Sequence, residues 1–588
     1  MFAVSFVYGN HSVSDIWISL LLVVDFLESH LLQLSCDNEN SLATVHSVSS
    51  SPLTFVSTSI KHAKTDLGKL RESGGLLCQR QFYTVIFPNR TVVNVEKPSC
   101  FLRKFTPDGA ALMAFDAQQS GVEIYSYAGM PAAGQLLHRL SAVMLCDDAE
   151  YSSLEIRKAL FSTLFRLKHG VSVLEPSAAA TLNRECSLFT ADSRHVIVGV
   201  SDVRRNNESL APSAFMGLED VTIFSLDLKE GRLCDKRLFK CDKIFLSHNQ
   251  GLYILERQLA VLSVQHQTIH LFQVQEDTGH LIPMLSVGRF LLDDDEFFLE
   301  ARLGWGVVQQ VEAPSTERVL SGLKQRILAY LYRGAKAEGE AALCRFYQHY
   351  LGYKRLKVVR MQLLERDVLL LRLASEDVAA MKTEPSHEQS LFVLYSISTT
   401  RVLHIWSGNS AHLLSLYEAH ADYFRHPDGV VRFPCSMASS EAARLNHVRY
   451  KHAIFHARGG GESEVRRRVL SQLPAAAQDF SPSPYLDMNL FSYDDKLISI
   501  LERPRTSGDT AVKFFDRKTE TLKFQIYCGL QSRQSQLQGS HSNSQRPLVA
   551  FIFHPFDPFA ISIQRNNRDY IVNFHIRAPE LHNATFVM

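Results

Sequence analysis

The strongest constraint in this sequence is a short unit of strand, tight turn and strand that recurs along most of the chain. In residues 100–127 an apolar stretch ends at Phe105, Thr106-Pro107-Asp108-Gly109 supplies a turn, and 111–115 and 122–127 alternate like strands. Proline fixes φ in such a turn, and glycine tolerates a positive φ. Short strands joined by tight turns are typical of the blades of a β-propeller.

The unit has four further copies. They lie within residues 186–228, 243–274, 489–515 and 549–576. Self-similarity of this kind favours a repeat architecture over chance. We therefore predict an all-β, WD40-like β-propeller over residues 80–588, with seven blades as the first expectation and eight as the second. We also expect residues 82–95 to pair with the blade made by the C-terminal strands, because this closure would leave no open sheet edge.

Some segments depart from this pattern. Helical spacing predicts insertions near 130–182, 317–350 and 409–480. Residues 1–79 show no blade pattern, so we expect an atypical N-terminal extension, either disordered or the product of a mispredicted exon. Its apolar run at 16–27 is too short to span a bilayer. No Lys or Arg precedes that run, as a signal peptide would require, and we expect either a buried helix or a wrongly predicted first exon there instead.

The charge balance and the cysteine content of the chain bear on which partners and which cellular compartment it suits. The 588 residues carry 62 Lys and Arg against 61 Asp and Glu, a formal charge of +1, which provides no general basic field for nucleic acid. The ten cysteines are scattered without a C-x-x-C pair, a usage that suits a reducing compartment such as the cytosol or nucleus.

Motifs for catalysis and cofactor binding are not recognisable in the sequence. We find no nucleophile elbow, P-loop, G-x-G-x-x-G after a strand, or H-E-x-x-H. The 24 histidines do not lie at zinc-ligand spacing from cysteines or carboxylates, and the acidic cluster 293–296 lacks the spacing of a calcium loop. We therefore predict no catalytic residues, no metal and no cofactor.

Two features allow alternative interpretations. The basic runs 354–360 and 466–468 are either nuclear-import or docking patches or, as we favour, solvated edges. The turn His554-Pro555-Phe556-Asp557-Pro558-Phe559 is either an exposed epitope or, as we favour, a rigid turn whose rings pack between neighbouring blades.

Several long stretches resemble the De-etiolated-1 family and occur in the family's order. They are residues 87–98 with 100–105, 182–189, 239–243 with 246–253, 483–487 with 490–496, and 551–564. The resemblance extends over roughly residues 82–577.

This resemblance implies a nuclear, non-catalytic adaptor and substrate receptor of cullin-4 RING ubiquitin ligases. The family binds the damaged-DNA-binding protein 1 scaffold together with a small associated adaptor subunit. It also engages the constitutively photomorphogenic RING ligase and ubiquitin-conjugating enzymes, promotes degradation of transcription regulators, and represses transcription, in part through histone tails. We expect no membrane partner and no direct contact with nucleic acid.

The resemblance also suggests docking residues. The family opens with a basic helix, which residues 60–71 match in part and residues 1–59 do not match. The scaffold-docking candidates from this segment are Leu67, Leu70 and Arg71. A further candidate is Arg577, since Phe574-His575-Ile576-Arg577 resembles the Trp-Asp-x-Arg ending of adaptor propellers. The same residues also fit an ordinary last strand.

Two other function classes stay open. A stand-alone histone-tail-binding chromatin reader would need an acidic pocket, because balanced charge does not favour phosphate binding. A propeller hydrolase would need His, Asp, Glu or Ser side chains that converge at the ends of the inner strands.

Overall fold

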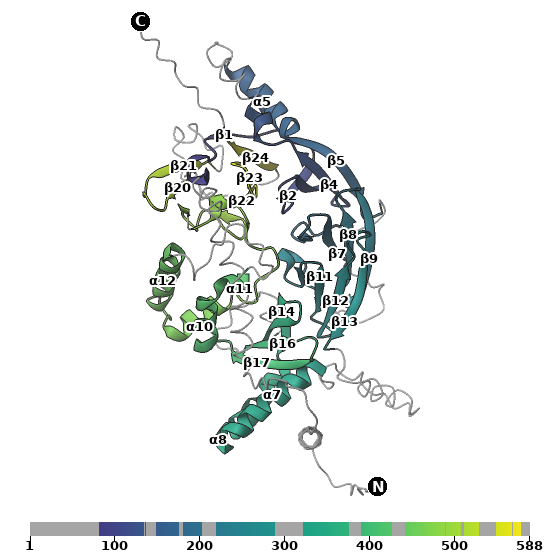
Figure 1. The fold of residues 1–588 in the computed structure, drawn as a ribbon, viewed down its shortest axis with the longest axis vertical. Coiled ribbons are helices and arrows are strands. Elements are labelled where there is room, and N and C mark those ends of the chain that lie inside the picture. Colours follow the sequence, from purple (N-terminus) through teal and green to yellow (C-terminus); the bar gives the residue numbers. More distant parts are fainter. Residues whose placement is uncertain are drawn as a thin grey trace, which may run out of the picture.

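The computed structural model describes residues 82–134, 136, 149–175, 180–202, 219–288, 322–375, 390–425, 441–488, 490–506, 511–527, 548–566 and 569–577. Within these residues the chain forms six antiparallel sheets that follow one another around an arc (Figure 1). The predicted all-β, propeller-like class is confirmed at this level. The count of seven or eight blades stays a prediction, because the described residues account for six sheets.

Four of the sheets contain four strands each, in chain order. The first is made of β2 (Cys100–Phe105), β3 (Ala111–Asp116), β4 (Gly121–Tyr127) and β5 (Phe165–Ser172). The second is made of β6 (Leu188–Phe189), β7 (His195–Asp202), β8 (Glu219–Asp227) and β9 (Arg232–Asp242). The third is made of β10 (Leu252–Leu255), β11 (Gln258–Ser263), β12 (Thr268–Val274) and β13 (Leu281–Val287). The fourth is made of β14 (Lys357–Glu365), β15 (Val368–Ala374), β16 (Leu391–Ser396) and β17 (Arg401–Ser407).

The two remaining sheets join the last part of the chain to its first described strand. One has the order β18 (Phe491–Ser492), β20 (Val512–Asp516), β21 (Leu522–Ile526). The other has the order β1 (Arg90–Val92), β24 (Asp569–Ile576), β23 (Ala560–Asn566), β22 (Leu548–Phe553), β19 (Arg505–Thr506). Thr91 of β1 lies opposite His575 of β24 in an antiparallel ladder. The predicted pairing of residues 82–95 with the C-terminal strands is therefore confirmed for Arg90–Val92, whereas residues 82–85 are helical.

The sheets are arranged radially. Neighbouring sheets contact one another through β22 and β2, through β6 and β10, and through β10 and β14. The last strands of three sheets also lie in a row, in which β9 contacts both β5 and β13. Strand β7, in the middle of its sheet, is rich in Val and almost wholly buried, as the two covered faces of a blade require.

The turns between the strands repeat one local hydrogen-bond pattern. Before β3, Thr106 Oγ1 donates to Asp108 Oδ1 (2.5 Å) and accepts from the backbone N–H of Ala111 (3.1 Å). Before β7, Thr190 Oγ1 donates in the same way to Asp192 Oδ1 (2.5 Å). These short polar side chains replace backbone partners in the turn, so the same sequence signature gives the same geometry in two sheets.

The turn at residues 554–559 packs between the first and last sheets. His554 is 3% exposed, and its Nδ1 accepts from the backbone N–H of Phe556 and Asp557, so Nε2 carries the proton and donates to the carbonyl of Gly109 (2.9 Å). Phe559 is fully buried. The favoured interpretation of this turn as an element packed between blades is confirmed.

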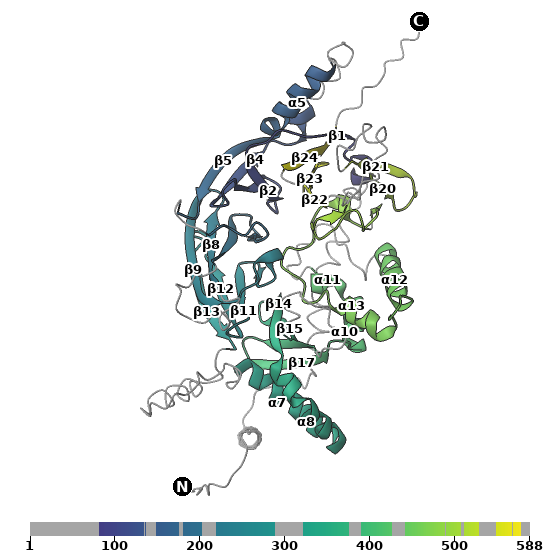
Figure 2. The same ribbon diagram turned by 180° about the vertical axis from the view of Figure 1, so that it is seen from behind.

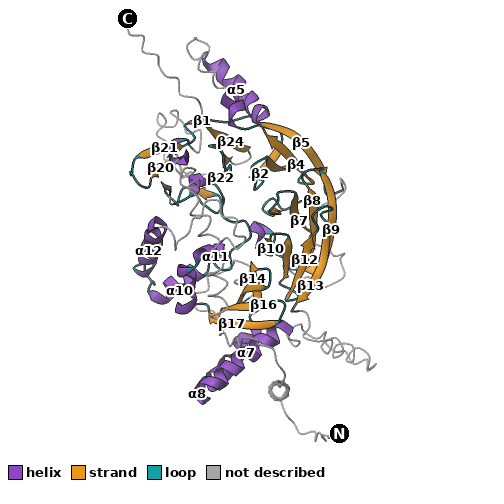
Figure 3. Cartoon of the chain, viewed as in Figure 1, coloured by secondary structure: helices purple, strands orange, loops and turns teal. Residues whose placement is uncertain are grey.

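Helices occupy three places around the sheets (Figure 3). They are α5 (Ala149–Leu164), α7 (Gly322–Glu338), α8 (Glu340–Arg355), α10 (Ala411–Ala419), α11 (Ala421–Arg425), α12 (Glu441–Phe455) and α13 (Glu462–Leu470). Helix α5 and the pair α7–α8 project from opposite ends of the arc, and α10–α13 lie between β17 and β20 (Figures 1 and 2). Of the helices in the described part of the chain, none combines the length and apolar character that crossing a membrane requires.

Residues 474–483, called the central segment below, run across the first strands of several sheets. The backbone N–H of Ala475 donates to Gln362 Oε1 of β14 (3.0 Å). The amide of Gln478 pairs with both backbone groups of Phe189 in β6 (2.5 and 3.0 Å). Lys104 Nζ of β2 reaches the carbonyl of Gln478 (3.5 Å). Three sheets are thus linked by a segment that has no blade pattern and that the sequence did not predict.

Candidate functional site

The predicted docking residues divide into two groups. Leu67, Leu70 and Arg71 lie outside the described residues. Arg577 directly follows β24 and is partly buried, with its guanidinium carbon 5.6 Å from the centre of the Phe87 ring. The three residues before it, 574–576, are buried strand, so Arg577 alone of the predicted ending reaches the surface. Its docking role stays a prediction.

Helix α8 presents exposed apolar side chains. Phe346 anchors it from a buried position, whereas Tyr347 and Leu351 are 42% and 66% exposed. Residues four apart lie on one face of a helix, so these two side chains form a continuous apolar strip. The helix projects from the arc beside α7 (Figure 1).

Helix α12 exposes a longer strip of this kind. Leu445, Val448 and Phe455 are 46%, 50% and 50% exposed, and their spacing places them with His452 along one face. Ile454 on the opposite side is buried in the cluster that joins the helices to the sheets. Contiguous exposed apolar surface often marks a protein-interaction site, and α12 is therefore the second candidate docking surface.

The two basic runs are largely engaged within the chain. In 466–468, Arg467 and Arg468 both pair with Glu464 (2.7 and 2.6 Å), and these hydrogen bonds lower the pKa of that carboxyl to about 2. In 354–360, Arg360 donates to the carbonyl of Ser471 (3.3 Å). These contacts favour the interpretation of 466–468 as ordinary surface charges. In 354–360, burial lowers the pKa of Arg360, so this side chain is not the solvated edge charge that was favoured.

Charged groups also meet beside the central segment. Burial lowers the pKa of Lys104 to about 8, although Glu502 attracts its charge, and burial raises the pKa of Asp479 and of Glu502. Arg503 donates to Asp479 (2.9 Å). Shifted pKa values occur both at active sites and in structural ion-pair networks. Because these groups contact the central segment and one another, we interpret them as a structural network.

Cavities lie among the described sheets, and two of them are lined by charged side chains. The larger, of about 820 Å³, is lined by Arg257 and Asp192, which pair at 3.2 Å, and by Arg366, which pairs with Glu256. The second, of about 560 Å³, lies beside β2 and β22 and is lined by Arg184, whose guanidinium stacks on an aromatic ring at 4.4 Å. In the described lining, these charged side chains are engaged with neighbours from the same chain.

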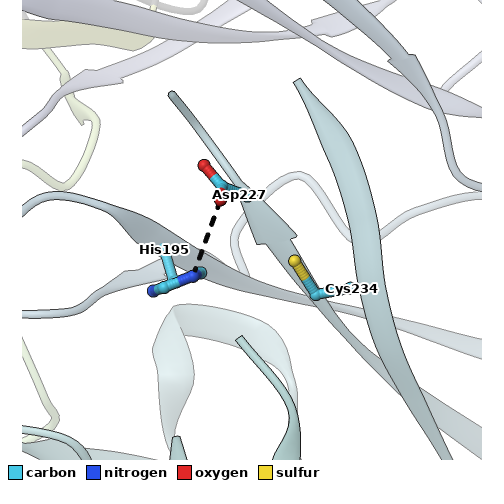
Figure 4. A group of neighbouring side chains, drawn as sticks. All are labelled: His195, Asp227 and Cys234. Atoms are coloured by element: carbon cyan, nitrogen blue, oxygen red, sulfur yellow. Dashed lines mark ion pairs between the residues drawn. The ribbon is translucent and has the colours of Figure 1, made fainter. Parts of the chain in front are cut away.

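Within the described residues, sequence analysis missed a cluster of potential metal ligands in which the histidine and aspartate are buried and the cysteine is half-buried. His195, Asp227 and Cys234 come from β7, β8 and β9 of one sheet, and one donor atom from each lies within 4.8 Å of the other two (Figure 4). His195 and Asp227 are 1% and 0% exposed, with Nε2 and Oδ2 separated by 4.0 Å. Zinc motifs in sequences rely on short spacings, whereas here strand pairing brings the residues together.

The protonation of this cluster follows from its surroundings. Burial lowers the pKa of His195, which favours the neutral imidazole. Burial alone would raise the pKa of Asp227, but hydrogen bonds from the backbone N–H groups of Glu230 and Lys229 outweigh it and lower that pKa. Burial raises the pKa of the Cys234 thiol. The cluster thus combines a neutral imidazole, a carboxylate and a thiol.

Comparison with solved structures gives similarities at low identity. The C-terminal WD40 domain of Sif2 is 8% identical, covers 84% of this chain and 100% of that chain, and gives a TM-score of 0.24. The Dos1 propeller is 10% identical, covers 56% of this chain and 53% of that chain, and also gives a TM-score of 0.24.

Comparison with curated proteins gives relatives along most of the chain. The light-mediated development protein DET1 of Solanum lycopersicum is 27% identical over 517 residues, which cover 85% of this chain and 94% of that protein. The Arabidopsis thaliana protein of the same name is 28% identical over 543 residues, with 85% and 95% covered. A family model described as De-etiolated protein 1 (Det1) matches residues 184–578, more than half of the sequence. The chain therefore belongs to the De-etiolated protein 1 family.

Proposed function

We propose that the chain is a non-catalytic adaptor and substrate receptor of a cullin-4 RING ubiquitin ligase in the nucleus. It bridges the damaged-DNA-binding protein 1 scaffold, a small associated adaptor subunit, a ubiquitin-conjugating enzyme and the photomorphogenic RING ligase. Through this assembly it promotes ubiquitination and degradation of transcription regulators and represses transcription, with histone tails as a further partner.

Family membership is the observation that carries this proposal. The match covers residues 184–578, and two curated relatives named for light-mediated development align with 85% of the chain. The stretches that resemble the family include the strands and turns around Phe553 and Phe559. These belong to the sheet of β1, β24, β23, β22 and β19, called the closing sheet below because it pairs the first described strand with the last. The resemblance therefore includes the framework that would position any partner.

The architecture supports a bridging role. Radial sheets form a rigid frame, and loops or helices on such a frame commonly carry function. The exposed apolar strips of α8 and α12 lie on separate helices, so two partners can bind without competing for one surface. An adaptor of this kind accelerates ubiquitin transfer by raising the effective concentration of substrate and enzyme.

Reconstitution tests the proposal directly. The full-length chain is mixed with the scaffold and the small subunit at micromolar concentration and passed over a size-exclusion column. We expect a single co-eluting complex that afterwards recruits the ubiquitin-conjugating enzyme and the RING ligase. Separate migration of chain and scaffold would overturn the proposal.

Single substitutions locate the contacts. Leu351→Glu on α8 and Leu445→Glu on α12 change side chains that are 66% and 46% exposed, so folding should be unaffected. Each is expected to weaken binding of at least one partner about tenfold or more, because a charge would be buried in an apolar contact. The matched control is Leu238→Glu on β9, which is 52% exposed and remote from both helices. Wild-type binding by both helix variants would remove α8 and α12 as docking surfaces.

A further inference from the structure

The cluster of His195, Asp227 and Cys234 lies at one end of the sheet β6–β9, where strand pairing fixes its geometry. His195 begins β7 and is the ladder partner of Asp227, which ends β8. On β9, Leu233 pairs with Leu226 and Asp235 with Ser225, which leaves Cys234 as the extra residue of a β-bulge. A bulge turns the side chain of its extra residue out of the regular alternation, and here the thiol faces the carboxylate.

A second hairpin in the same chain shows what this arrangement does without a metal-ligand set. In β20–β21, Asp516 Oδ1 accepts two backbone N–H groups of the turn, and Oδ2 pairs with Lys523 Nζ at 3.6 Å. Lys523 follows Asp516 by seven residues and is likewise the extra residue of a bulge. In this hairpin a lysine side chain neutralises the second carboxylate oxygen.

In β8–β9 the same turn has a thiol in place of the ammonium. Asp227 Oδ1 again accepts two backbone N–H groups, at 2.8 and 3.0 Å, but the residue seven positions later is Cys234. Asp227 Oδ2 receives no hydrogen bond from the described residues, and it forms an ion pair with Arg194 Nε at 3.7 Å, a distance close to that of the Lys523 pair. The same oxygen also faces the imidazole, 4.0 Å away, and the thiol.

The imidazole of His195 is also incompletely satisfied. Its side chain is 1% exposed, and Nε2 makes no hydrogen bond within the described part of the chain. A buried polar atom without a partner destabilises the folded state. A bound cation would satisfy the nitrogen and the carboxylate oxygen together, and it would replace the weak hydrogen bond (3.9 Å) that the Cys234 thiol donates to the carbonyl of Arg232.

We propose that His195 Nε2, Asp227 Oδ2 and Cys234 Sγ bind one zinc ion. Zinc accepts this mixture of nitrogen, oxygen and sulfur donors, whereas Ca²⁺ and Mg²⁺ require oxygen ligands. Bond lengths of about 2.0–2.3 Å place tetrahedral ligands about 3.4–3.6 Å apart, so donor atoms now within 4.8 Å need only a small movement. Cys234 binds as the thiolate, and its proton leaves to water.

The neighbouring charges allow such an ion. Arg194 directs its two terminal nitrogens to Asp277, with distances of 3.3 Å to Oδ1 and 2.9 Å to the carbonyl oxygen. One carboxylate and one thiolate balance the charge of Zn²⁺, so the guanidinium would face a neutral centre. The ion would tie together the ends of β7, β8 and β9.

A turn of the adjacent sheet covers the cluster. A side-chain carbon at Gly279, where φ is +71°, would lie 2.7 Å from His195 Cδ2 and 2.8 Å from Cys234 Sγ. Gly279→Ala is therefore expected to displace two of the three ligands without removing any donor.

Metal titration of the full-length chain tests the proposal. Chelator-treated protein is titrated with Co²⁺ and Zn²⁺, and bound metal is measured together with the thiolate-to-cobalt charge-transfer band. We expect one zinc per chain and a cobalt band that Cys234→Ser abolishes. Zinc affinity should fall about 100-fold or more in that variant, since even partners of a ligand contribute 10–100-fold. The matched control is Cys241→Ser, which removes an exposed thiol of the same strand and should leave both signals unchanged.

A measurement on the wild-type chain keeps the test independent of folding defects in variants. Alkylation of individual thiols is followed by mass spectrometry with and without zinc. Zinc is expected to slow the modification of Cys234 and to leave that of Cys241 unchanged. Equal alkylation of Cys234 in both conditions, or an undiminished cobalt band in Cys234→Ser, would overturn the zinc site.

Discussion

Protonation of His575 should destabilise the closing sheet. This residue of β24 is 1% exposed, with Nδ1 2.9 Å from Thr91 Oγ1 and Nε2 2.9 Å from Ser562 Oγ. Hydroxyl oxygens can accept from either ring nitrogen, so the hydrogen bonds persist when the ring is charged. Burial is what lowers the pKa of His575 from 6.5 to about 3.

The sign and size of the effect follow from proton linkage. Above pH 6.5 the histidine is neutral in both states, and its contribution to stability is fully present. Between pH 6.5 and about 3 the unfolded chain binds a proton that the folded sheet excludes, so each pH unit lowers stability by about 1.4 kcal/mol. At pH 5 the loss is about 2 kcal/mol, or roughly a 30-fold increase in opening.

Hydrogen exchange of peptides from residues 569–577 measures this opening. Exchange is compared at pH 7 and pH 5, after correction for the intrinsic rate, in the wild type and in His575→Gln. The wild type should lose about 2 kcal/mol more opening free energy than the variant. Peptides from β10–β13 serve as the internal control, because His266 and His270 there are not buried. Parallel changes in wild type and variant would refute the reasoning.

Two further substitutions test the packing of the frame. Gln478→Ala removes both hydrogen bonds to the backbone of Phe189 and should lower the free energy of unfolding by about 2–4 kcal/mol, which a lower melting temperature would report. Gln472 is exposed, so Gln472→Ala should have little effect in the same assay. Gly109→Ala places a methyl group 2.7 Å from His554 at a φ of +73° and should lower the free energy of unfolding by about 1–3 kcal/mol. The control in the same thermal assay is Gly134→Ala, because the space around Gly134 is open. Unchanged melting of Gln478→Ala or Gly109→Ala would contradict these contacts.

The parts of the fold that local chemistry determines could be predicted from the sequence. The turn at Thr106 and Asp108 forms through side chains two residues apart, so its signature is contained in one short window. The pairing of β1 with β24 joins residues far apart in the chain. The repeat pattern still predicts it, because a propeller whose first and last blades did not pair would leave an unfavourable open edge.

The buried cluster and the central segment could not be predicted in this way. His195 and Asp227 are 32 residues apart, and only the ladder register places them opposite each other. The orientation of Cys234 depends on a bulge, which shifts alternation by one residue and has no clear sequence signal. The contacts of Gln478 with β6 depend on sheets that form elsewhere in the chain.

The position of the central segment has a mechanical consequence. Its first residues follow α13 directly, and its amide groups are fixed to β6 and β14. The chain that leaves α13 is therefore held against β6 and β14, and α12 is connected to the same strands through α13. A force applied by a partner bound to α12 would be transmitted through the central segment to β6 and β14. The helices and the sheets would then move together as one rigid body.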